Sequence, residues 1–192
     1  SASTDIGYIA YINDDDSKLR FEASDGTDEY ELASTNAFTE SGWHSFGIIW
    51  DDNSSERTGL YIDGFKDETA TTTGTQSSVD SLGNSVSFNI GSESDGGGPF
   101  QGSLDDIRLY HRTLTDSEME ALSHETASAN GNPILVGHWT FDGPTLSGTS
   151  VADMSSGGHS GTRTGTTTVP GTVGQALSLN GTSDLVSLGN VY

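Results

Sequence analysis

The stretch that decides the fold is Gly102-Ser-Leu-Asp-Asp-Ile-Arg-Leu-Tyr-His-Arg-Thr-Leu-Thr-Asp-Ser-Glu-Met-Glu-Ala-Leu122. From 103 to 110 its residues alternate between two faces, and a period of two residues predicts a β-strand. Thr115 is followed three residues later by Glu118, the spacing of a capping box at the start of a helix. The stretch therefore predicts a strand, a tight turn and one short helix near 115–123.

The composition of the chain is strongly acidic. Among 192 residues there are 7 Lys plus Arg against 28 Asp plus Glu, which gives a formal net charge of −21. This balance argues against nucleic acids and anionic membranes as partners. It suits a soluble surface, and it also supplies the carboxylates that calcium prefers as ligands.

Several classes of protein are excluded or disfavoured by what the sequence lacks. With no cysteine there is no disulfide framework and no thiol chemistry. No apolar run approaches the roughly 20 residues that a membrane-spanning helix needs, so membrane insertion is not expected. No signal peptide is visible, and we expect Ser1 to begin a mature or excised segment.

Outside the deciding stretch, the chain contains short candidate β-strands separated by turns. Each is bounded by Gly, Asn, Asp or Ser clusters, which is typical of an all-β, antiparallel β-sandwich or jelly roll. The Asp-Gly pair at 63–64 predicts a tight primed turn in a hairpin, and the polar segment 124–133 is expected to be a linker. The candidate strands are Tyr8–Ile12, Lys18–Ala23, Glu29–Ala33, His44–Trp50, Thr58–Ile62, Ser85–Ile90, Ser103–Tyr110, Leu135–Phe141, Gln175–Leu179 and Asp184–Leu188.

In combination, four motifs give the chain a specific family resemblance. It resembles the laminin G-like, concanavalin A-like jelly-roll domains of secreted and cell-surface proteins. One motif is similar to the family's Trp-His strand, one to its Tyr-x-Asp-Gly hairpin, one to its closing strand, and the last to its opening. They are Gly42-Trp-His-Ser-Phe-Gly-Ile-Ile-Trp-Asp51, Leu60-Tyr-Ile-Asp-Gly64, Phe100-Gln-Gly-Ser-Leu-Asp-Asp-Ile-Arg-Leu-Tyr110, and Leu135-Val-Gly-His-Trp-Thr-Phe-Asp-Gly143 with Gly174-Gln-Ala-Leu-Ser-Leu-Asn-Gly181.

The order of these motifs departs from the family. Residues 1–123 resemble the closing two-thirds of such a sandwich, and residues 134–192 resemble its opening third, joined by the linker at 124–133. The resemblance also implies a hydrophobic, Trp-containing strand between the opening and closing parts, which this sequence does not contain. Three explanations remain open: a circular permutant, a segment of a tandem array, or a subunit that exchanges its halves with neighbouring copies.

A sandwich that lacks a strand would leave backbone groups unpaired, and such an edge invites completion by another chain. If 134–192 docks on the next copy, the contact is head to tail, and head-to-tail contacts that do not close produce filaments. We therefore expect copies of the same chain to be its partners, as a polymer or as tandem repeats.

The resemblance further implies a structural calcium site where the opening and closing segments meet. The carboxylates in those segments are Asp105, Asp106, Asp142 and Asp153, with Gly carbonyls nearby. Hard oxygen ligands on adaptable loops suit Ca²⁺. The alternative is that Asp142, Asp153 and their Gly neighbours only form turns.

Catalysis finds no support in the sequence. A glycosidase on this fold requires two carboxylates flanking a sugar, and the Glu-x-Asp-x-x-Glu strand of the related glucanases has no counterpart. Glu29 and Glu31 lack that spacing, and Glu93 lies in an expected loop. The five His residues show no metal-binding spacing. We predict that the chain is not an enzyme.

The predicted function is that of an extracellular structural or adhesive subunit at the cell surface, assembled by strand exchange and stabilised by calcium. The alternative is a carbohydrate-binding module of a larger secreted enzyme, because lectin-like sites stack aromatic rings on sugars. Possible partners are therefore polysaccharides or cell-surface glycans, and no ligand-binding residues can be named. Trp43, Trp50 and Trp139 are expected in the core.

Overall fold

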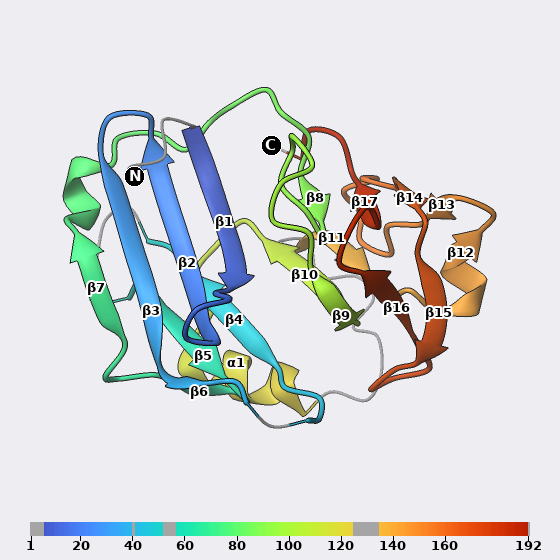
Figure 1. The fold of residues 1–192 in the computed structure, drawn as a ribbon, viewed down its shortest axis with the longest axis horizontal. Helices are drawn as coiled ribbons and strands as arrows, with labels where there is room; N and C mark the ends of the chain where they lie inside the picture. Colours follow the sequence, from blue (N-terminus) through green and yellow to red (C-terminus); the bar gives the residue numbers. More distant parts are fainter. Residues whose placement is uncertain (1–5, 40, 52–56, 125–134, 192) are drawn as a thin grey trace. The chain divides into compact units, whose positions relative to one another are not determined.

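The computed structural model describes residues 6–39, 41–51, 57–124 and 135–191. The chain forms two compact units, one of residues 1–84 with 113–125 and the other of residues 85–112 with 126–192 (Figure 1). All strand pairs among the described residues are antiparallel, as the sequence predicts. In the same residues, no helix has the length and apolar character needed to cross a membrane.

The first unit contains two sheets and the α-helix. Strand order is β1-β2-β3-β7 in the larger sheet and β4-β5-β6 in the smaller. The bounds are β1 Ile6–Ile12, β2 Lys18–Asp25, β3 Glu29–Ala37, β4 Phe46–Ile49, β5 Gly59–Ile62, β6 Phe65–Lys66 and β7 Thr71–Gly74, with a 3₁₀ turn at Gln76–Ser78 and α1 at Asp116–Ser123.

Alternation along the strands builds the core of the first unit. In β2, Leu19 and Phe21 are buried against Leu60 and other apolar residues of the unit, while the residues between them face away, as the period of two requires. Trp50 packs beside this core, with its ring centroid 5.9 Å from that of Phe21 and 5.8 Å from that of Tyr30.

The predicted turn and helix are both confirmed. Asp63 and Gly64 have φ angles of 51° and 88°, the positive values of a type I′ hairpin turn between β5 and β6. Helix α1 begins with a complete capping box, in which the Thr115 side chain accepts from the Glu118 amide and the Glu118 side chain accepts from the Thr115 amide. The absence of a side chain at Gly47 in β4 lets Met119 of the helix approach the sheet closely.

The second unit is assembled from two segments that are far apart in the sequence. Residues 135–191 pair with residues 85–112 through three strand pairs, β10 with β11, β9 with β16, and β8 with β17. The sheets have the orders β12-β13-β14-β17-β8, β15-β16-β9 and β10-β11. The bounds are β8 Asn89–Ile90, β9 Gln101–Leu104, β10 Ile107–Tyr110, β11 Leu135–Trp139, β12 Leu146–Ser147, β13 Ser150–Val151, β14 Gly161–Thr164, β15 Thr167–Pro170, β16 Gln175–Asn180 and β17 Leu185–Ser187, with a 3₁₀ turn at Gly143–Thr145.

The core of the second unit draws on both segments. Trp139 and Phe141 are fully buried among Val151, Leu177 and Val186 of the same segment. Ile90 from the other segment belongs to the same cluster, and Phe88, Phe100, Leu104, Ile107 and Leu109 pack against it. Neither segment encloses this core alone.

Three differences between the structure and the sequence prediction bear on the candidate sites. The strand predicted over Ser103–Tyr110 is broken at Asp105–Asp106, where Asp106 takes a φ of 55°, so that β9 and β10 pair with different partners. Trp43 is not in the core, since it is 44% exposed. The compact units also do not follow the predicted segments 1–123 and 134–192, because 85–112 groups with the C-terminal residues. The predicted linker at 124–133 lies outside the described residues except for His124.

The solvent-facing side of the larger sheet of the first unit carries facing carboxylates. Glu22 of β2 lies directly opposite Glu31 of β3 and accepts a hydrogen bond from the Tyr11 hydroxyl of β1. Arg20 donates to Glu31 at 2.9 Å and to Asp16 at 2.8 Å. Burial, together with the neighbouring Glu29 and Glu31 charges, raises the pKa of Glu22, against the opposing effect of the Tyr11 hydrogen bond.

We predict that Glu22→Gln stabilises the protein at neutral pH. The folded protein binds the Glu22 proton more tightly than the unfolded chain does, so the ionised carboxylate destabilises the fold at pH values above the raised pKa. That penalty disappears as the pH falls below the ordinary value of 4.5. Because the site is partly exposed, the expected gain in the free energy of unfolding is at most about 1 kcal/mol.

Urea denaturation at neutral pH and below about pH 4.5 measures this difference. Asp28→Asn is the control, since it removes an equal charge from an exposed position in the turn between β2 and β3. An equal gain for both variants would mean that overall charge, and not the Glu22–Glu31 pair, sets the effect.

Candidate functional site

The predicted calcium-binding carboxylates all lie in the second unit, and two of them hold the same turn. Asp105, between β9 and β10, accepts hydrogen bonds through Oδ2 from the amides of Thr172 at 2.8 Å and Val173 at 3.2 Å. Asp142, after β11, accepts through Oδ1 from the amide of Gln175 at 2.9 Å. The two carboxylates thus fix the turn between β15 and β16 from both sides.

Asp105 retains an oxygen without a partner. Its Oδ1 is buried and makes no hydrogen bond. Burial raises the pKa of Asp105 most, and the charges of Asp106 and Asp142 raise it further, against the two amides that lower it. A cation beside Asp105 would relieve both the desolvation and the repulsion between carboxylates.

Asp106 belongs to a separate charged cluster. Its Oδ1 contacts Nε2 of the fully buried His138, and its Oδ2 accepts from Arg108 Nη2 at 3.0 Å. Burial tends to raise the pKa of Asp106, but the hydrogen bond from His138 and the charges of Arg108 and His138 outweigh it and lower the pKa. Both carboxylate oxygens are therefore occupied by side chains.

Asp153 is an anchor for the backbone of its own segment. Oδ1 accepts from the amides of His138 at 2.9 Å and Ser155 at 2.8 Å, and Oδ2 accepts from the amide of His159 at 2.8 Å. Together with Ser155, whose hydroxyl donates to the Val136 carbonyl at 2.9 Å, it satisfies the edge of β11 that does not face β10. The three amides lower the pKa of Asp153 although burial opposes them.

The four predicted ligands therefore do not converge on a single metal site. Among the residues that the structure describes, no three His, Asp or Glu side chains are grouped as a metal ion requires. Of the oxygens of these four carboxylates, Asp105 Oδ1 and Asp142 Oδ2 accept no hydrogen bond within the described part of the chain. A calcium ion here would therefore depend on these two oxygens and on backbone carbonyls and water. Such a ligand set suits Ca²⁺, which tolerates irregular geometry.

A different set of exposed groups lies at one end of the first unit. Trp43, which precedes β4, and Phe46, the first residue of β4, are 44% and 46% exposed. Between them, His44 contacts the Phe38 ring at a centroid distance of 5.5 Å and the Asp63 carboxylate at 3.0 Å. Exposed rings beside fixed polar groups are what a carbohydrate site uses.

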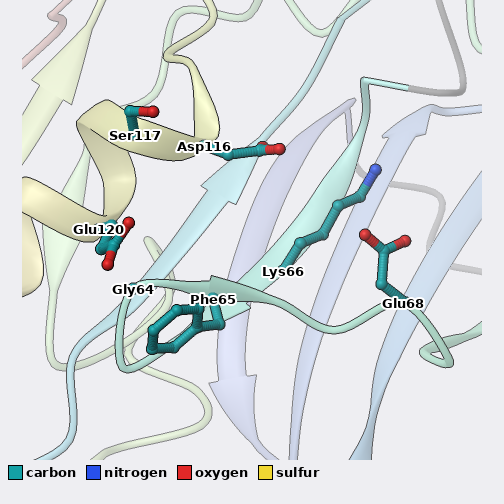
Figure 2. Close-up of a pocket in the computed structure, with 7 residues that line it drawn as sticks. All are labelled: Gly64, Phe65, Lys66, Glu68, Asp116, Ser117 and Glu120. Carbon is teal, nitrogen blue, oxygen red and sulfur yellow. The ribbon is translucent and has the colours of Figure 1, made fainter.

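A shallow pocket lies beside this end, between the β5–β6 hairpin and helix α1. Figure 2 shows its lining residues, with Phe65 and Lys66 on the hairpin, Glu68 after it, and Asp116 and Glu120 on the helix. The sequence predicts the hairpin and the helix separately, but it does not predict the contact between them. No sequence spacing connects residues 64–68 with 116–120, because their proximity depends on the packing of α1 on the sheet.

Comparison with known families assigns the chain to a protein family. A family model described as the concanavalin A-like lectin/glucanases superfamily, Laminin_G_3, matches residues 1–120. No match was found among curated proteins or solved structures. The matched residues contain the Trp-His strand, the Asp-Gly hairpin, the broken closing strand and the first part of helix α1, and they cover more than half of the sequence. The chain belongs to the laminin G-like family of the concanavalin A-like lectin/glucanase superfamily.

Proposed function

We propose that the chain is a non-catalytic extracellular adhesive or structural module that assembles head to tail by exchanging its C-terminal segment. Domains of this family are generally non-catalytic binding modules, typically extracellular, of the carbohydrate-binding or adhesive type. Assembly by exchange is our extension of that family-level statement.

The observation that carries the proposal is the composition of the second unit. Residues 135–191 are joined to residues 85–112 by main-chain hydrogen bonds along three strand pairs, and both segments contribute to one core. All contacts of these three pairs can form equally well between two copies, because exchange preserves every native interaction. The equilibrium between the closed monomer and the exchanged assembly then depends on two things, the connection between the segments and the protein concentration.

The exchanged contact is head to tail. One copy presents β8, β9 and β10, and the next presents β11, β16 and β17, which are different surfaces. Heterologous contacts of this kind extend without limit unless a ring closes. An open-ended assembly is the architecture that a surface fibre requires.

Calcium has a defined place in this proposal. Asp105 belongs to the segment that receives the C-terminal residues, and Asp142 belongs to the segment that is donated. An ion held by Asp105 Oδ1 and Asp142 Oδ2 would therefore bind the two segments together, in one chain or between copies.

Carbohydrate binding is a second candidate, favoured by the exposed Trp43 and Phe46. Large apolar side chains exposed together mark an interaction surface more often than chance. The nearby His44–Asp63 pair supplies groups that hydrogen-bond hydroxyls.

A disulfide trap tests exchange directly. Ser103 of β9 and Ser178 of β16 are directly opposed, at the separation of neighbouring strands that a disulfide can bridge, and the chain has no other cysteine. Oxidised Ser103→Cys/Ser178→Cys protein should form a ladder of covalent multimers on a non-reducing gel, growing with protein concentration.

The control is Thr162→Cys/Ser187→Cys, because β14 and β17 both lie in the C-terminal segment and pair in the same way whether or not it is exchanged. It should remain at the monomer mass under the same oxidation. A single monomeric band for both variants at all concentrations would show that the chain closes on itself.

Calcium removal should lower the melting temperature of the wild-type protein. Asp105→Asn keeps an acceptor for the Thr172 and Val173 amides but removes the charge, so its melting temperature should not depend on calcium. Scanning calorimetry with calcium, with a calcium chelator and with magnesium measures this. A wild-type curve that is the same in all three solutions would remove calcium from the proposal.

Loss of the exposed rings should weaken any binding to polysaccharide. Trp43→Ala and Phe46→Ala should each reduce retention about three- to tenfold, the size of a lost aromatic contact, in affinity electrophoresis against a panel of neutral and acidic polysaccharides. Val86→Ala is the control, since Val86 is 49% exposed in the second unit. Equal retention of all variants would rule out this surface as a sugar site.

A further inference from the structure

The pocket between the β5–β6 hairpin and α1 presents an aromatic ring to solvent. Phe65 is 61% exposed, the most exposed of the large hydrophobic side chains in the described residues, and it is held on a rigid support. The type I′ turn at Asp63–Gly64 fixes the hairpin. There is no room for a side chain at Gly64, because a Cβ there would meet Ser123 and Glu120 of the helix.

Carboxylates surround this pocket. Glu68, Asp116 and Glu120 line it, with Lys66 as the one cation of the lining, and Ser117 and Gly64 complete it (Figure 2). Asp116 uses Oδ1 to accept from the Tyr61 hydroxyl at 2.7 Å. The side chains of Glu68 and Glu120 have no hydrogen-bond or ion-pair partner within the described part of the chain.

The carboxylates of the pocket contribute to a raised pKa of the neighbouring Tyr61. Burial raises the pKa of the Tyr61 hydroxyl, and the hydrogen bond to Asp116 and the charges of Asp116 and Glu68 raise it further. The same charges that oppose a second anion at this place favour a cation.

We propose that this pocket binds an arginine side chain of a partner protein. A guanidinium group can lie on the exposed face of the Phe65 ring and donate hydrogen bonds to Glu120, whose Cα lies against Gly64 beside Phe65. Arginine suits the site better than lysine because its planar group stacks on aromatic rings and pairs with carboxylates in a fixed geometry.

The partner is a protein with a basic surface and not a second copy. The net charge that follows from 28 acidic against 7 basic residues attracts a basic partner at long range, whereas the exchange proposed above relies on main-chain pairing in the second unit. The inference does not depend on strand exchange, because the pocket lies in the first unit and the exchanged strands lie in the second.

The test is an NMR titration of the isotopically labelled full chain with an end-blocked Gly-Arg-Gly peptide. The amide signals of residues 64–68 and 116–120 should shift with saturation. The neutral analogue, with citrulline in place of arginine, should shift them much less at equal concentration, and the lysine peptide should bind more weakly than the arginine peptide.

Variants then separate this pocket from general attraction to an acidic protein. Phe65→Leu keeps apolar area but removes the ring, and should weaken binding about two- to fivefold. Glu120→Gln should weaken it by a similar factor. Glu93→Gln removes the same charge from an exposed loop of the second unit and should leave binding unchanged.

Three results would overturn the proposal: no saturable shift in the pocket, equal binding of the citrulline peptide, or equal effects of Glu120→Gln and Glu93→Gln. Because Phe65 and Glu120 are exposed, both variants should retain the wild-type amide spectrum away from the pocket, which shows that loss of binding is not loss of folding.

Discussion

The second unit depends on one requirement, that the backbone groups of the closing strands β9 and β10 find partners. These strands are broken from one another at Asp105–Asp106, where the positive φ of Asp106 turns the chain. The break sends β9 to β16 and β10 to β11. This main-chain pairing joins segments that are far apart in the sequence and brings the C-terminal segment into the core. The same pairing places Asp105, Asp106 and Asp142 beside their hydrogen-bond partners.

Strand and helix signals that act over a few residues were predictable from the sequence. The capping box of Thr115 and Glu118, the Asp63–Gly64 turn and the alternation in β2 all have causes within one or two turns of chain. The break at Asp105–Asp106 was not predictable, because the alternation continues through it. Strands β12 and β13 have two residues each, which is too few to show an alternation of apolar and polar residues. Their formation depends on the strands with which they pair.

The candidate sites show the same division. That the opening and closing segments lie together follows from the family resemblance, but the assignment of each carboxylate does not. In the sequence alone, nothing distinguishes Asp153 and Asp106 from Asp105 and Asp142. In the structure, three backbone amides occupy the carboxylate oxygens of Asp153. The side chains of His138 and Arg108 occupy those of Asp106. Trp43 lies in an apolar run and was expected in the core, but the run begins before the strand does, which leaves the ring outside. The Phe65 pocket combines two predicted motifs whose contact only the packing of α1 creates.

The path of the chain between the two units has a consequence for proteolysis. The chain leaves the first unit after residue 84, returns to it at 113 for α1, and belongs to the second unit from 126 to 192. A protease that cut once between α1 and β11 would release no domain. The fragment from β11 onward would remain bound to β8, β9 and β10 through their hydrogen bonds and shared core. The nicked protein would behave as a two-chain complex, and its pieces, once separated, should recognise each other again as complementary fragments.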